Sequence, residues 1–158
     1  MKRIFYVLIV VLVLGVLFTG CQQSLVISQV DYAQPVESVL EPDSTGKVED
    51  IRSGLSFNIL SLQHAETGDS SSVHTEQIRL LRGKEGYYYI TAENYRHVYV
   101  MAPEKSSLKL VRKVKIDEDG IKKPALNQRE GYVLLLSRET DRTYQITPEG
   151  IRQESEEN

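Results

Sequence analysis

The chain has 158 residues, 41% hydrophobic and 26% charged, which suits one globular domain and is short for two. Removing residues 1–20, which include Lys2 and Arg3, leaves 17 basic and 22 acidic residues and a net charge of −5. A nucleic-acid partner requires a basic surface that replaces phosphate counterions, so the acidic balance argues against one.

The N-terminal segment has the features of an export signal. Lys2 and Arg3 precede an uncharged apolar run over residues 4–18, shorter than the roughly 20 residues of a membrane-spanning helix. A positive start, a short apolar run and small residues at its end are typical of a secretory signal. We expect residues 1–20 to form a signal helix that is cleaved from the mature protein.

The residues that close this segment are more specific. Leu17-Phe18-Thr19-Gly20-Cys21 resembles the lipobox of bacterial lipoproteins, in which a small residue precedes an obligatory cysteine. The resemblance implies lipid on the Cys21 sulfur, cleavage before Cys21 and acylation of the new amino group. Phe18 departs from the pattern, where Leu, Val or Ile is commoner. An uncleaved anchor and an ordinary cleaved signal with a free thiol are the alternatives.

A lipid anchor at Cys21 has consequences for location and folding. Cys21 is the only cysteine, so an internal disulfide is excluded and the fold depends on a hydrophobic core. Two or three acyl chains hold a protein firmly in a membrane. Retention in the inner membrane resembles a rule that calls for Asp after the cysteine, where this chain has Gln22. We expect a lipid-anchored cell-envelope protein, in the outer membrane rather than the inner one.

The mature chain divides into a tether over residues 21–35, one β domain over 36–150 and a disordered acidic tail over 151–158. Short segments rich in β-branched and aromatic residues, separated by turn signals, predict an all-β fold, a small antiparallel sandwich or barrel. The predicted strands are 36–40, 48–51, 55–59, 77–82, 86–91, 96–101, 108–116, 131–137 and 142–147.

Two connections and one strand are predicted in more detail. The turn-rich residues 41–46 predict a hairpin between 36–40 and 48–51, and residues 66–72 predict a loop. In the strand 108–116, alternation predicts one apolar face. That face would carry Leu108, Leu110, Arg112, Val114 and Ile116.

An internal repeat relates residues 85–104 to residues 130–149 at an offset of 45 residues. Both segments begin Glu-Gly-Tyr, both end Pro-Glu, and both have Tyr at the fifteenth place. The mature chain is too short for the four blades of about 45 residues that a propeller requires. The repeat therefore predicts two similar hairpins, each preceded by a glycine and closed by a proline.

Two groups of polar residues contain the residue types of a reactive site. His64 and His74 flank the loop that carries Glu66 and Asp69, but their spacing matches no compact metal-ligand motif. Asp69, His74 and the serines 70–72 contain the residue types of a hydrolase triad, yet no G-x-S-x-G elbow occurs. Solvated loop residues explain both groups, so we predict no catalytic residue, no metal and no cofactor.

The tyrosines suggest a binding face. Seven of the nine lie between Tyr87 and Tyr144. A three-residue loop over 92–94 would set Tyr87 opposite Tyr99 and Tyr89 opposite His97. The same register would set Tyr132 opposite Tyr144. Such a register gives one partly exposed candidate binding face of Tyr87, Tyr89, His97 and Tyr99. Ordinary packing of these rings is the alternative.

The expected function is a non-catalytic interaction or accessory module of the envelope, with an envelope protein as partner. The alternative is a small β-barrel that carries a lipid or another apolar ligand. An apolar cavity would favour the carrier, whereas a flat tyrosine face would favour the interaction module. An enzyme would require histidines and carboxylates brought together from distant segments.

The lipobox generates the first testable prediction. Mass spectrometry of membrane-extracted protein should find a mature N-terminus at Cys21 carrying acyl mass, because the only cysteine follows Leu-Phe-Thr-Gly directly. Cys21→Ser protein should lose this modification and its membrane association. An intact Met1, or equal recovery of soluble wild-type and Cys21→Ser protein, would contradict the prediction.

Overall fold

Antiparallel strands and one short helix make up the part of the chain that can be described. A computed structural model describes residues 35–152 and is 47% strand. The signal segment 1–20, Cys21, the tether up to residue 34 and tail residues 153–158 lie outside the described residues. The expected strand-dominated antiparallel fold is confirmed, and its sheets are not closed into a barrel.

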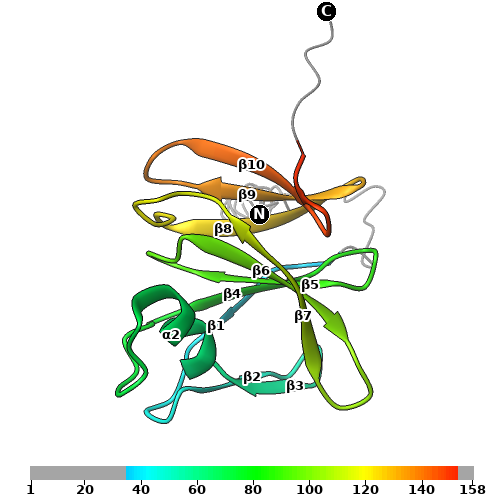
Figure 1. The fold of residues 1–158 in the computed structure, drawn as a ribbon. Coiled ribbons are helices and arrows are strands. Elements are labelled where there is room, and N and C mark those ends of the chain that lie inside the picture. Colours follow the sequence, from blue (N-terminus) through cyan, green and yellow to red (C-terminus); the bar gives the residue numbers. More distant parts are fainter. Residues whose placement is uncertain (1–34, 153–158) are drawn as a thin grey trace, which may run out of the picture. The chain divides into compact units, whose positions relative to one another are not determined.

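A five-stranded sheet forms the centre of the domain, with the strand order β1-β4-β5-β6-β7 (Figure 1). Every residue of β5 is buried, because other elements cover both faces of the sheet. Thr91 is the polar residue of this strand, and its hydroxyl donates to the His97 carbonyl oxygen at 2.9 Å. The strands are β1 (Ser38–Leu40), β4 (Ile78–Arg82), β5 (Tyr88–Ala92), β6 (His97–Pro103) and β7 (Leu108–Lys115).

A four-stranded sheet in the order β11-β10-β9-β8 covers one face. Its strands are β8 (Pro124–Arg129), β9 (Tyr132–Ser137), β10 (Arg142–Thr147) and β11 (Gly150–Ile151). β11 includes Ile151, which the sequence assigns to the tail. The shared core contains Leu81, Tyr89, Val98, Val100 and Val114 from the central sheet and Leu126, Val133, Leu135 and Ile146 from the second sheet.

The sequence analysis did not predict β8. Its first residue is Pro124, which a strand tolerates at its start and at the edge of a sheet, and β8 is an edge strand. Gln128 is buried in this strand because its amide is satisfied there. Its Oε1 accepts from the Lys84 backbone N–H at 3.2 Å, and its Nε2 donates to the Tyr132 carbonyl oxygen at 3.2 Å. A buried polar residue thus interrupts the apolar pattern.

The hairpin β2 (Lys47–Asp50)–β3 (Leu55–Asn58) and helix α2 (Leu60–Thr67) cover the other face of the central sheet. The predicted hairpin between residues 36–40 and 48–51 is wrong, because β1 pairs with β4 and β2 pairs with β3. The turn over residues 41–46 instead passes the chain from one sheet to another.

Helix α2 occupies the beginning of the segment that was predicted as a loop. The Leu60 N–H donates to Oδ1 of Asn58 at 2.8 Å, which satisfies one of the free amides at the helix start. Gly68 ends the helix at φ 77°, the left-handed conformation common after a last helical turn. Glu66 and Thr67 therefore belong to the helix.

The two Tyr-containing hairpins share one register, and it is not the predicted one. Tyr89 pairs with Val100 instead of His97, and Tyr144 pairs with Leu135 instead of Tyr132. Each hairpin has a four-residue loop, over 93–96 and 138–141, where three residues were predicted. The two loops are 45 residues apart, so the sequence repeat corresponds to two hairpins of equal loop length and register.

The extra loop residue places the residues of the predicted binding face on different sides of the sheet. Successive strand residues point to opposite faces, so an odd shift of register exchanges the faces of one strand relative to the other. Tyr89 consequently packs toward the four-stranded sheet, whereas Tyr99 packs toward the β2–β3 hairpin. The two rings are only 2% and 1% exposed.

An irregularity in β7 also changes the predicted faces of that strand. Val100 pairs with Arg112 and Met101 pairs with Leu110, which leaves Val111 as the additional residue of a β-bulge. Leu108 packs in the core under the β2–β3 hairpin, whereas Val114 packs in the other core. The single apolar face predicted for residues 108–116 is therefore wrong.

The position of Tyr89 gives a stability prediction. Tyr89→Ala should lower the free energy of unfolding by about 3–5 kcal/mol, the usual cost of removing a buried ring. Tyr144→Ala is the control and should cost clearly less, because Tyr144 is only partly buried at the margin of the same core. Urea denaturation of both variants measures this. Equal losses would contradict the packing described here.

Candidate functional site

A buried carboxylate gathers several side chains at helix α2. The Glu66 side chain is 0% exposed. Its Oε1 accepts from the Tyr99 hydroxyl at 2.6 Å and lies 2.9 Å from Nδ1 of His97. Its Oε2 accepts from the Arg96 backbone N–H at 2.8 Å, and the Lys113 Nζ lies 3.8 Å from Oε1. Two of the predicted binding residues, His97 and Tyr99, therefore belong to an internal cluster around Glu66.

The Glu66 cluster fastens the helix to the central sheet. Lys113 donates to the Ala65 carbonyl oxygen at 3.0 Å, and the Arg96 guanidinium donates to the Glu66 carbonyl oxygen at 2.7 Å. These are the carbonyls of the last helical turn, which lack partners within the helix. The Lys113 Nζ also lies 5.5 Å from the centre of the Tyr99 ring. Cationic and neutral donors satisfy both oxygens of the Glu66 carboxylate, so the cluster has a structural role.

Burial controls the titration of this cluster. The pKa of His97 is lowered by burial, and the neighbouring positive charges of Lys113 and Arg96 act in the same direction, whereas Glu66 opposes the shift. The pKa of the Tyr99 hydroxyl is raised, first by burial and then by its hydrogen bond to Glu66. The neutral forms of both rings are therefore favoured in the folded protein.

The remaining tyrosines of the predicted face lie elsewhere. Tyr87 is partly buried against the core that contains Tyr89. Burial raises the pKa of the Tyr89 hydroxyl. The structure thus does not bring Tyr87, Tyr89, His97 and Tyr99 to one exposed face, because the observed register separates them.

The loop after α2 does bring Ser72, His74 and Asp69 together. Oγ of Ser72 and Oδ2 of Asp69 each lie 3.0 Å from the same ring nitrogen, Nε2 of His74. In a triad the serine and the carboxylate bind different ring nitrogens. One nitrogen accepts the serine proton, and the N–H of the other donates to the carboxylate. A hydrogen bond from the Ser71 backbone N–H is the largest cause that lowers the pKa of Asp69 to about 2.

Buried Gln63 gives this loop its shape. Its Nε2 donates to the Ser72 carbonyl oxygen at 2.7 Å, and its Oε1 accepts from the His74 backbone N–H at 2.9 Å. The serines and His74 are exposed around it. The loop is thus held by an internal amide, and the Ser-His-Asp contacts lie on its outer surface.

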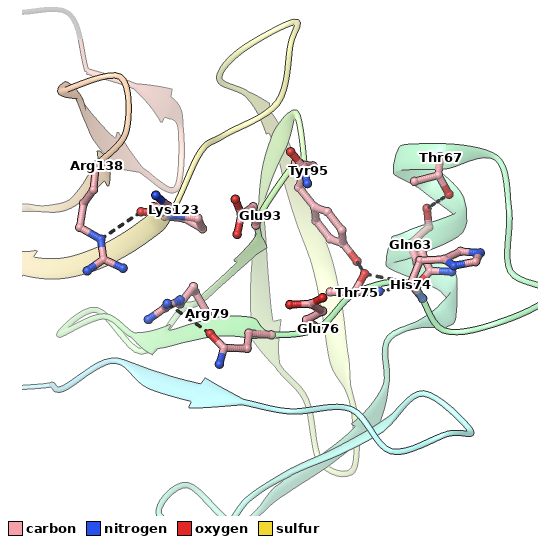
Figure 2. Close-up of a pocket in the computed structure, with 13 residues that line it drawn as sticks. Gln63, Thr67, His74, Thr75, Glu76, Arg79, Glu93, Tyr95, Lys123 and Arg138 are labelled. Carbon is pink, nitrogen blue, oxygen red and sulfur yellow. Dashed lines mark hydrogen bonds between the residues drawn. The ribbon is translucent and has the colours of Figure 1, made fainter.

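A polar cavity of about 620 Å³ opens beside this loop (Figure 2). Its lining includes the basic Arg79, Lys123 and Arg138 and the acidic Glu76 and Glu93. The basic groups are already engaged within the domain. The Arg79 guanidinium lies 3.3 Å from Oε2 of Glu37, and the Lys123 Nζ lies 3.1 Å from Oε2 of Glu139. Nε of Arg138 donates to the Lys123 carbonyl oxygen at 3.1 Å. The cavity therefore offers no concentration of one charge that would select a ligand.

A second cleft, of about 630 Å³, lies between the β2–β3 hairpin, helix α2 and the ends of β5, β6 and β7. About half of its lining is apolar, a larger share than in the polar cavity. The apolar lining residues are Leu55, Phe57, Leu62, Tyr88, Ile90, Met101, Pro103 and Leu108. Pockets of this size with apolar walls and a few polar groups are the usual form of small-molecule sites. We refer to this site as the apolar cleft, and it is the candidate functional site.

The two sides of the apolar cleft come from separate layers of the fold. Phe57 and Leu62 project from the covering layer, and Met101 and Leu108 project from the central sheet. All four are only partly buried although they pack against the core. The bulge at Val111 contributes, because it places Leu108 on the face of the cleft. Sequence reasoning missed the cleft, since its residues come from five elements and each resembles a core residue.

Within residues 35–152, no cluster of three or more His, Cys, Asp and Glu side chains could hold a metal ion, and no helix has the length and hydropathy to cross a membrane. No protein-family model, curated protein or solved structure matches the chain.

The lowered pKa of His97 gives a pH prediction. A histidine whose pKa is lower in the folded than in the unfolded protein destabilises the fold as the pH falls, because the unfolded chain binds the proton first. Stability should therefore decrease as the pH falls through 6.5 toward the folded value. His97→Gln should weaken this dependence, measured by urea denaturation at pH 7.5 and 5.5. The exposed His64→Gln is the control, and an unchanged slope in His97→Gln would contradict the prediction.

Proposed function

We propose that this chain is a lipid-anchored lipoprotein of the bacterial cell envelope whose β domain binds an apolar ligand in the apolar cleft without transforming it. The observation that carries the binding role is the cleft itself, a space of about 630 Å³ between two layers of the domain. Clefts of this size that combine apolar side chains with polar groups are the usual form of small-molecule sites, which supports a binding role.

The anchor is supported by the sequence of the export segment. Cys21 is the only cysteine and directly follows Leu17-Phe18-Thr19-Gly20. Sixteen residues separate Cys21 from the first described strand, which begins at Ser38. A segment of this length allows the β domain to stand away from the membrane surface. Gln22 after the cysteine supports the outer membrane, in a bacterium that has one.

The chemistry of the described residues supports binding over catalysis. Both oxygens of the buried Glu66 carboxylate accept hydrogen bonds, one from Tyr99 of β6 and one from Arg96 in the β5–β6 loop. Ser72 and Asp69 compete for one nitrogen of His74. The apolar cleft combines aliphatic and aromatic side chains with hydroxyl and amide groups and with the charged Glu104 and Lys105, and its lining has no histidine or cysteine. Such a lining supports holding a ligand.

Docking of an envelope protein is the second candidate function. Leu110 and Val111 are 49% and 47% exposed on the edge strand β7. Exposed apolar side chains that lie together on an edge can contact a partner through their side chains. Crosslinking in the native envelope would distinguish this role, because Val111→Asp should abolish the crosslinked complex and leave ligand binding unchanged.

Binding to the apolar cleft can be tested with neutral alkyl alcohols. The mature chain is used, with Cys21→Ser so that no acyl chain is attached, and the alcohols displace a neutral fluorescent naphthylamine. Affinity should increase by up to about fourfold per added methylene, since each buried methylene contributes about 0.8 kcal/mol. The increase should stop once the cleft is filled.

A matched pair of variants assigns this binding to the cleft. Leu108→Trp fills the cleft and should lower the affinity at least tenfold. Val111→Trp makes the same change on β7 outside the cleft lining and should leave the affinity unchanged. Absence of saturable binding in the unsubstituted chain, or equal effects of the two variants in proteins of equal thermal stability, would refute the binding role.

A further inference from the structure

We propose that the ligand of the apolar cleft is a fatty-acid anion, a single aliphatic chain whose carboxylate lies at the rim beside Lys105. This inference rests on the proposed function and adds the chemical class of the ligand. It depends on the distribution of charge around the cleft, which differs from the net acidic balance of the chain.

Two charged residues line the cleft, Glu104 and Lys105. Glu104 is already engaged, because its Oε2 accepts from the Ser107 hydroxyl at 3.3 Å and its Oε1 lies 4.0 Å from the Lys109 Nζ. Lys105 is exposed and has no ion pair or hydrogen bond to any other residue of the described range 35–152. The unneutralised charge at the rim is therefore positive.

A second cation lies against a residue of the cleft wall. The Arg82 guanidinium lies 5.7 Å from the centre of the Tyr88 ring, and Tyr88 lines the cleft. Arg82 also has no ion-pair partner among residues 35–152. The stacked position holds the charge on an aromatic surface, where a guanidinium is stable without a carboxylate. Lys105 and Arg82 are thus two cations at or next to the cleft lining without a carboxylate partner among residues 35–152.

The remaining rim groups suit a carboxylate as well. Ser56, Ser61 and Ser106 also line the cleft and can donate hydrogen bonds from their hydroxyls. The deeper wall, with Tyr88, Ile90 and Met101, has no charged group. An aliphatic chain therefore fits the interior and a single anionic group fits the opening. The volume of about 630 Å³ corresponds to one small ligand.

The test compares three ligands of equal chain length at pH 8 and low salt: dodecanoate, dodecanol and dodecylammonium. The mature Cys21→Ser chain binds each below its micellar concentration, measured by displacement of the neutral naphthylamine. Dodecanoate should bind tightest and dodecylammonium weakest. An exposed ion pair contributes about 0.2–1 kcal/mol, so Lys105 should contribute up to about fivefold and the more distant Arg82 less. The preference should decrease as salt screens the charges.

Three variants locate the preference. Lys105→Gln and Arg82→Gln should each reduce the ratio of dodecanoate to dodecylammonium affinity and leave dodecanol binding unchanged. Lys84→Gln removes an exposed lysine outside the cleft lining and should change nothing. Thermal melting verifies that all three variants fold equally well.

The possible failures are distinguishable. Binding of all three ligands with equal affinity, or tighter binding of dodecylammonium, would overturn the fatty-acid inference and leave the proposed apolar binding intact. No binding of any ligand would overturn both. Occupation of the cleft by a second copy of the chain would appear as a dimer in sedimentation equilibrium that Leu108→Trp dissociates, and this would overturn the inference as well.

Discussion

The central strand β5 is buried along its whole length, and this constraint determines the rest of the fold. Tyr88 and Ile90 require an apolar cover on one face of the sheet, and Tyr89 requires one on the other. The chain satisfies both by continuing into a four-stranded sheet after β7 and by placing a hairpin and a helix before β4. The only cysteine, Cys21, precedes the first described strand, so no internal disulfide stabilises the domain. Its stability therefore depends on this burial of both sheet faces.

The two covers are unequal, and the apolar cleft results from the difference. A four-stranded sheet covers one face, whereas a two-stranded hairpin and an eight-residue helix cover the other. The Glu66 cluster holds the C-terminal turn of that helix against β6 and β7. At the opposite end, Met101 and Leu108 extend beyond the cover and are only partly buried. The hairpin and helix are therefore fixed to the central sheet at the Glu66 cluster, whereas the cleft beside Met101 and Leu108 stays open.

The sequence predicted the strand content and most strand positions, because alternation and β-branched residues are local signals. It could not predict pairings that depend on one residue. A loop of four residues in place of three separated Tyr89 from Tyr99, and one bulged residue, Val111, moved Leu108 to another face. Helix α2 lacks a wide apolar stripe, because its two buried residues, Gln63 and Glu66, are polar and are held by hydrogen bonds. The cleft, assembled from distant elements, left no local pattern.

The bulge at Val111 has a consequence for the crowding that the proposed lipid anchor would impose on copies of the chain. Proteins confined to a plane meet far more often than proteins in free solution, and an open strand edge is a template for filament growth. The bulge interrupts the regular spacing of backbone groups on β7, and the exposed Arg112, which has no ion-pair partner among residues 35–152, places a positive charge on this edge. Two-dimensional crowding, which the proposed anchor entails, is therefore compatible with copies that do not join edge to edge.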